Sequence, residues 1–71
     1  MSARLDALAG RLDLPLLVTD LTNIRYLTGF DSSNAALVVE PGGEAILYTD
    51  FRYIESARAV EGVEPVLAKR A

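Results

Sequence analysis

Apolar side chains near the start of the chain recur at helical spacing. Four of them occupy positions i, i+3, i+4 and i+7, which is one stripe of an α-helix: Leu5, Leu8, Ala9 and Leu12. We therefore predict a helix over residues 2–12, with Ser2 as its N-cap. Pro15 follows closely, and the residue before a proline is driven out of helical backbone angles, so the helix ends before it.

Four later segments have the pattern of strands. Residues 15–19 are an almost entirely apolar run bounded by turn residues, which is typical of a strand buried on both faces. Residues 35–40 and 44–49 are joined by a Pro-Gly-Gly turn, which predicts a β-hairpin. Residues 63–67 form the fourth predicted strand, and Pro65 within it favours an edge position.

Two aspartates precede the other two predicted helices. Asp20 is expected to cap a helix over residues 21–27, and Gly29 to supply the left-handed residue after its end. Asp50 is expected to cap a helix that runs from 51 to about 60. The residues predicted to face the core are Ile24 and Leu27 in the first helix, and Phe51, Ile54, Ala57 and Val60 in the second.

The predicted order of elements is α-β-α-β-β-α-β, without a repeat or a linker. Strands that alternate with helices indicate an α/β fold, here a mixed sheet with helices packed on it. A chain of 71 residues buries only about 60% of its unfolded surface, so its stability alone is marginal. Because no element follows the last strand to cover its edge, we expect the chain to be part of a larger domain and, alone, to self-associate.

Composition removes several classes of function. The chain has no Cys and no His, so disulfides, thiolate or imidazole catalysis and Cys/His zinc sites are excluded. Its net charge is −3 and its basic residues are scattered, which argues against a nucleic-acid partner. No apolar run approaches the length of a membrane span. We expect a cytoplasmic protein that binds neither nucleic acid nor membranes.

Asp20 and Asp50 are the first candidates for chemistry, because open α/β sheets bind ligands at strand ends. One interpretation is a carboxylate pair that holds Mg²⁺ or Mn²⁺. The alternative, which we favour, is that both are helix caps, since such an ion needs more oxygen ligands than two separate acids supply.

Two arginines are the next candidates, because a guanidinium binds a carboxylate through two parallel hydrogen bonds. For Arg25 we favour pairing with a local acid. For Arg52, two roles are about equally supported: pairing with Asp50 or Glu55, and contact with a substrate. A cation in the first turn of a helix opposes the helix dipole, which indicates a reason for this position other than helix stability. The three tyrosines fit packing in or beside the core better than acid–base chemistry, since phenols titrate near about 10. The residues alone thus assemble no nucleophile with a base.

Two longer motifs carry a resemblance. The first is Asn-Ile-Arg-Tyr-Leu-Thr-Gly-Phe (23–30), and the second is Thr-Asp-Phe-Arg-Tyr (49–53). Leu-Leu-Val-Thr-Asp (16–20) precedes them, and Ser32–Asn34 lies between them. Together these segments resemble the N-terminal domain of the creatinase/prolidase family. That family includes Xaa-Pro aminopeptidases and Xaa-Pro dipeptidases. The likeness extends from the first helix to Lys69, with a departure at Leu21, where many relatives have proline. The motif residues with expected structural roles are Asp20, Asn23, Arg25, Tyr26, Gly29, Phe30 and Asp50.

The resemblance implies a ribonuclease-H-like sheet in a domain longer than residues 1–71, which are expected to be only part of it. Family members carry a C-terminal catalytic domain that binds two divalent ions, usually Mn²⁺ or Co²⁺, through two Asp, one His and two Glu. The metal-activated hydroxide there hydrolyses the bond before a proline. No catalytic residue, metal ligand or cofactor is expected in the present chain. The implied partners are this catalytic domain and a further subunit of a homodimer or higher oligomer.

The resemblance also implies a role for Arg52 and its neighbours Phe51 and Tyr53, because this domain overhangs the active site of a partner subunit. These three residues are the candidates for substrate contact. The chain is therefore predicted to be the oligomerisation and active-site-capping portion of a proline-specific metallopeptidase. The alternative is a stand-alone binding or dimerisation module that has the same fold and no enzyme.

Overall fold

A computed structural model describes residues 3–68 of the chain. The predicted Ser2 cap and Lys69, where the family likeness ends, lie outside the described residues. The order of elements is the predicted one. The elements are α1 (Ala3–Ala9), β1 (Leu16–Val18), α2 (Leu21–Thr28), β2 (Ala35–Val39), β3 (Ala45–Thr49), α3 (Ile54–Arg58) and β4 (Glu64–Leu67).

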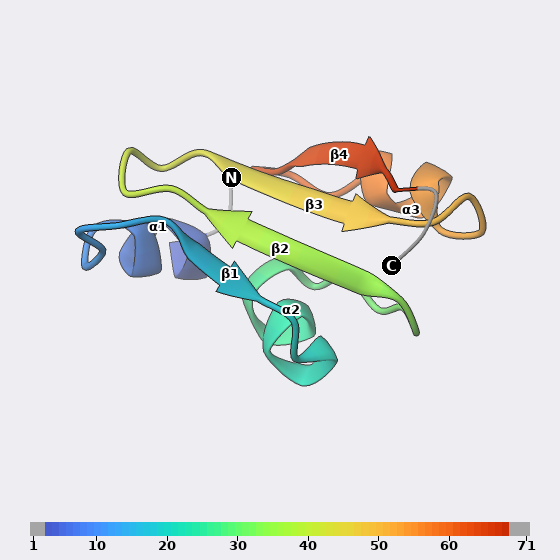
Figure 1. Ribbon diagram of the computed structural model, residues 1–71, viewed down its shortest axis with the longest axis horizontal. Helices are drawn as coiled ribbons and strands as arrows, with labels where there is room; N and C mark the ends of the chain where they lie inside the picture. The colour runs from blue at the N-terminus through green and yellow to red at the C-terminus, as the bar shows by residue number, and fades with distance from the viewer. Residues whose placement is uncertain (1–2, 69–71) are drawn as a thin grey trace.

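The four strands form one mixed sheet in the order β1-β2-β3-β4 (Figure 1). β1 and β3 both run antiparallel to β2, whereas β4 runs parallel to β3. The predicted hairpin is confirmed, with Val39 opposite Ala45 next to the turn and Ala35 opposite Thr49 at the far end. Gly43 has φ 102°, a left-handed conformation that glycine adopts without steric cost. The sheet is therefore the predicted mixed one, and β4 lies at its edge.

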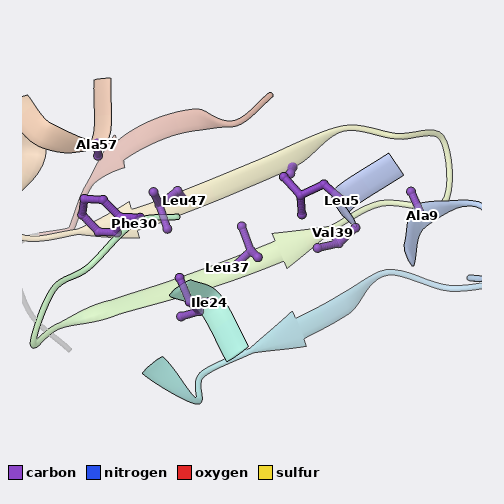
Figure 2. Packing of buried hydrophobic residues seen from close by; sticks show 9 residues of the cluster. Leu5, Ala9, Ile24, Phe30, Leu37, Val39, Leu47 and Ala57 are labelled. Atoms are coloured by element: carbon purple, nitrogen blue, oxygen red, sulfur yellow. The ribbon is translucent and has the colours of Figure 1, made fainter. Parts of the chain in front are cut away.

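The core lies on one face of the sheet, and all three helices pack on that face (Figure 1). Side chains alternate between the two faces of a strand, so every second residue of β2 and β3 points toward the helices. Leu37, Val39 and Leu47 are fully buried there, with Ile24 of α2 packed against them (Figure 2). The buried cluster consists of Leu5, Ala9, Ile24, Phe30, Leu37, Val39, Ala45, Leu47 and Ala57.

The prediction that residues 15–19 are buried on both faces is wrong. Leu16 is 38% and Leu17 62% exposed, and only Val18 of β1 packs against the core. β1 is the outer strand of the described sheet and pairs only with β2. Its apolar composition is therefore not matched by burial within residues 3–68.

The first helix is shorter than predicted because its last turn tightens. Gly10 still donates its N–H to the Asp6 carbonyl four residues back, at 3.1 Å. The next two N–H groups bond only three residues back, to Leu8 and Ala9, which is the usual way that a helix end satisfies its last carbonyls. Leu12 nevertheless packs against the core, so the predicted apolar stripe is correct.

Both predicted ends of α2 are confirmed. The Asp20 carboxylate accepts hydrogen bonds from the N–H groups of Thr22 (2.8 Å) and Asn23 (3.2 Å), which have no partner within the helix. Gly29 follows the helix with φ 79°, and its N–H bonds to the Arg25 carbonyl at 2.7 Å. These caps turn Ile24 into the core.

No helix among residues 3–68 is long and apolar enough to span a bilayer.

Candidate functional site

The register of the hairpin brings two polar residues together at the end of the sheet opposite the turn. Ala35 and Thr49 form the last pair of β2 and β3, so Asn34 and Asp50 flank that pair directly. The Thr49 hydroxyl donates to the Asn34 carbonyl at 2.7 Å and fixes the entry to β2. The Asn34 amide donates to Asp50 Oδ2 at 3.0 Å. The strand ends thus build one polar cluster, which we call the junction site: Ser33, Asn34, Asp50, Arg52 and Tyr53.

Asp50 is the centre of the junction site. Asp50 is only 8% exposed, and both oxygens of its carboxylate accept hydrogen bonds. Besides Asn34, it accepts from the Arg52 N–H at 2.9 Å, from Arg52 Nε at 3.2 Å and from Arg52 Nη2 at 2.7 Å. A carboxylate that is nearly closed to solvent requires such partners, because a buried charge without them is costly.

These donors lower the pKa of Asp50 from 3.8 to about 2. The hydrogen bond from the Arg52 side chain is the largest cause, followed by that from Asn34. Both favour the ionised carboxylate, since a protonated acid accepts them less well. In turn, Asp50 raises the pKa of Arg52. The pair is therefore ionised at every physiological pH.

Acid is expected to remove the contribution of Asp50 to stability. The pKa of Asp50 in the folded state is below its ordinary value, so this contribution is complete above about 4 and disappears as the pH falls toward about 2. Asp50→Asn should therefore have a free energy of unfolding that is lower than that of the wild type at pH 7 and approaches it near pH 2. Urea unfolding followed by circular dichroism across this range measures both profiles.

The control for this titration is Asp31→Asn, which changes an exposed acid of the preceding loop. Its difference from the wild type should stay small and nearly constant with pH. A difference between wild type and Asp50→Asn that does not shrink between pH 5 and pH 2 would contradict the assigned role of Asp50.

The helix after Asp50 begins later than predicted, which changes the interpretation of Arg52. α3 starts at Ile54, with Tyr53 at its N-cap position, and residues 51–53 form a turn instead. Because Asp50 is held by Arg52 and Asn34, it caps this turn and not the helix. The predicted opposition between Arg52 and a helix dipole is therefore wrong, and the prediction that Phe51 faces the core is wrong too, since Phe51 is 77% exposed.

Of the two acids considered for Arg52, the structure selects Asp50. Glu55 pairs with Arg58 on the next turn of α3. The Arg52 side chain remains 56% exposed, and its Cζ lies 5.3 Å from the centroid of the Tyr53 ring. Since only Nε and Nη2 bond to Asp50, the Nη1 donors of Arg52 have no partner among residues 3–68. The guanidinium is thus held on one side and presented to solvent on the other.

Tyr53 connects the junction site to the core. Its ring meets the buried Phe30 edge to face, with centroids 6.5 Å apart and planes at 86°. Its hydroxyl lies 2.8 Å from the Ser33 hydroxyl. Tyr53 therefore packs as predicted for the tyrosines, while Phe51 stands out from the surface beside it.

The motif residues of α2 and its N-cap are not brought to the junction site. Asp20 and Asn23 belong to the cap of α2. The predicted pairing of Arg25 with a local acid is wrong, because Arg25 is exposed and no acid of residues 3–68 lies within ion-pair distance of it. Tyr26 is 59% exposed, and the guanidinium of Arg4 stacks on its ring at 4.2 Å.

A metal pair at Asp20 and Asp50 does not fit this arrangement. One carboxylate caps α2 and the other is bound by Arg52 and Asn34. Within residues 3–68 no three acids, histidines or cysteines gather in a way that could hold a metal ion. The ligand set that the resemblance implies for a two-metal centre has no counterpart in these residues, so no chemical step is assigned to a metal here.

The family follows from comparison with known proteins. The sequence profile of the Creatinase/Prolidase N-terminal domain matches residues 3–71. The chain belongs to the creatinase/prolidase N-terminal domain family. The mixed four-stranded sheet with helices matches part of the fold of solved proteins of this family.

Three relatives show the extent of the likeness. The creatinase/prolidase-like N-terminal domain of a Corynebacterium diphtheriae protein is 41% identical, with a TM-score of 0.86 over 96% of this chain and 59% of that one. An aminopeptidase P (Xaa-Pro aminopeptidase) of Streptococcus thermophilus is 36% identical, with a TM-score of 0.73 over 94% of this chain and 53% of that one. The uncharacterised peptidase YqhT of Bacillus subtilis is 50% identical over 50 residues, which are 69% of this chain and 14% of that protein.

This member of the creatinase/prolidase family thus spans well under two thirds of each of these relatives. In the junction site, the sequence pointed to Asp50, Arg52 and Tyr53, whereas Ser33 and Asn34 entered only as part of the family motif and not as site residues. The missed signal is the symmetry of the hairpin. Counting outward from the Pro-Gly-Gly turn places Asn34 and Asp50 on opposite strands at the same distance, so an amide and a carboxylate meet there.

Proposed function

We propose that the chain is the N-terminal, oligomerisation and active-site-capping portion of a proline-specific metallopeptidase of the Xaa-Pro aminopeptidase or dipeptidase type. The observation that carries the proposal is the family match over residues 3–71 together with its Xaa-Pro aminopeptidase relative. In this proposal the divalent metal pair, Mn²⁺ or Co²⁺, belongs to a separate C-terminal catalytic domain. The protein acts in the cytoplasm, which suits a chain without cysteines.

The junction site supports the capping role. Asp50 restrains Arg52 through two side-chain hydrogen bonds, so the guanidinium loses little freedom when it binds a further anionic group. Its free Nη1 donors and the exposed ring of Phe51 beside it offer one charged and one apolar contact. A substrate peptide has both features, a carboxylate or carbonyl oxygen and an apolar side chain. Arg52, Phe51 and Tyr53 are therefore the proposed substrate-facing residues.

A direct test is the activity of the pure 71-residue chain with Mn²⁺ on an Xaa-Pro dipeptide and a longer Xaa-Pro peptide. No turnover is expected, because the proposed metal centre lies in another domain. Metal-dependent hydrolysis by the chain alone would contradict the proposal.

The competing function is a stand-alone binding or dimerisation module. Reading the gene beyond Ala71 separates the two. A continuation that encodes the His, Asp and Glu ligands of a metal pair supports the peptidase, whereas a stop codon at that point supports the module.

A further inference from the structure

Asn34 connects the turn that carries Arg52 to the start of a neighbouring strand, β2. Its side-chain amide donates to Asp50 Oδ2 at 3.0 Å, across 16 positions of the sequence. The three hydrogen bonds between Arg52 and Asp50, in contrast, join residues that are only two positions apart. Among residues 3–68, Asn34 is thus the one donor to this carboxylate from outside the turn.

The backbone of Asn34 is fixed independently of its side chain. Thr49 is only 2% exposed, and its hydroxyl donates to the Asn34 carbonyl at 2.7 Å. Ala35, the next residue, is the strand partner of Thr49. Because the backbone is already ordered and the side chain is short, directing the amide at Asp50 costs little conformational freedom. A substitution of Asn34 leaves the Thr49 bond intact, since that bond ends on a backbone oxygen.

The two carboxylate oxygens of Asp50 have different partners. Oδ1 accepts from the Arg52 backbone N–H, whereas Oδ2 accepts from Arg52 Nε, Arg52 Nη2 and the Asn34 amide. The torsion angle that rotates a carboxylate about its Cβ–Cγ bond has broad minima, so hydrogen bonds decide it. Without Asn34, Oδ2 is held only by the side chain that it has to hold. The direction of the Arg52 guanidinium therefore depends on the Asn34 amide.

We propose that Asn34 is a positioning residue for substrate binding, which acts through Asp50 and directs the free Nη1 donors of Arg52 toward an oxygen of the substrate. This role of Asn34 rests on the proposed function, because it needs Arg52 to face the substrate. A guanidinium held in one orientation loses less conformational freedom on binding than a mobile one. Asn34 acts through its two neighbours and makes no contact with the substrate.

A double-mutant cycle of Asn34→Ala and Arg52→Ala in the metal-loaded, full-length peptidase tests this role. Asn34→Ala alone should lower kcat/KM for an Xaa-Pro peptide by about 10-fold, the effect of one hydrogen bond to a charged group. The loss should appear in the same parameter, kcat or KM, as that of Arg52→Ala. In the Arg52→Ala background, Asn34→Ala should change kcat/KM by less than about 2-fold, because no guanidinium is left to direct.

Two further variants separate hydrogen bonding from packing. Asn34→Leu keeps a branched side chain of similar size but has no donor, so its kcat/KM should fall as far as that of Asn34→Ala. The matched control is Asn23→Ala, which changes the only other asparagine of the chain, an exposed residue in the first turn of α2. The kinetics of this control should equal those of the wild type.

Hydrogen exchange at the Arg52 side chain gives a second measurement, which needs no substrate. In NMR spectra of the same proteins, the Arg52 Nε–H signal should persist in the wild type and in Asn23→Ala. It should be lost to exchange with water in Asn34→Ala and Asn34→Leu, because the carboxylate that binds it is no longer fixed.

Several results overturn the positioning role alone. They are wild-type kinetics of Asn34→Ala or Asn34→Leu, effects of Asn34→Ala and Arg52→Ala that simply multiply, and an Arg52 Nε–H signal that persists in Asn34→Ala. Loss of the fold in both Asn34 variants overturns it too, since Asn34 is then a stabilising residue only. If Arg52→Ala itself leaves kcat/KM unchanged, the proposed substrate contact of Arg52 fails, and the role of Asn34 fails with it.

Discussion

Arg52→Ala in the full-length peptidase is expected to lower kcat/KM for an Xaa-Pro peptide by about 10- to 150-fold, which corresponds to the loss of one hydrogen bond to a charged group. The physical reason is the arrangement of the guanidinium. Asp50 occupies Nε and Nη2, whereas Nη1 is free to bind a polar group of the substrate. Steady-state kinetics of purified wild type and variant measure the effect.

Arg58→Ala is the matched control. Arg58 also pairs with an acid, Glu55, but both side chains are largely exposed on α3, and such surface pairs contribute little. Its kinetics should equal those of the wild type. Arg52→Lys separates the roles of Arg52, because it keeps the charge and loses the guanidinium fork. If Arg52→Ala lowers the melting temperature while kcat and KM stay unchanged, Arg52 only stabilises the junction site and is not a substrate contact.

Leu47→Ala is expected to destabilise the 71-residue chain by about 2–5 kcal/mol, the range for truncation of a fully buried leucine. Leu47 is completely buried in the centre of β3, among side chains from the helices and β2 (Figure 2). A chain of this size has a total stability of only about 4–10 kcal/mol. The variant should therefore lose a large part of this stability and unfold at a clearly lower temperature and urea concentration than the wild type. Thermal and urea unfolding followed by circular dichroism provide the measurement.

Leu14→Ala serves as the control for the core, because Leu14 is 75% exposed and its truncation leaves no cavity. Its free energy of unfolding should lie within about 0.5 kcal/mol of that of the wild type. Equal unfolding midpoints for Leu47→Ala and the wild type would mean that the helices do not pack on this face of the sheet in solution.

The elements of the fold were predictable from local signals in the sequence. A Pro-Gly-Gly turn between two apolar runs determines the hairpin, and Asp20 and Gly29 determine the two ends of α2. Each of these signals acts through backbone hydrogen bonds or φ angles within a few residues, so it needs no knowledge of the tertiary structure. The family motifs were recognisable for the same reason, since they are contiguous.

The exposure of β1 and the start of α3 were decided by the tertiary structure. An apolar run such as 16–18 does not reveal which neighbours cover it, and here β1 is an outer strand with one face uncovered. Asp50 has the sequence of a helix cap, but Asn34, 16 residues earlier in the chain, and the Arg52 side chain bind its carboxylate. The helix therefore begins only at Ile54. A local preference was overruled by partners that only the pairing of β2 with β3 brings into reach.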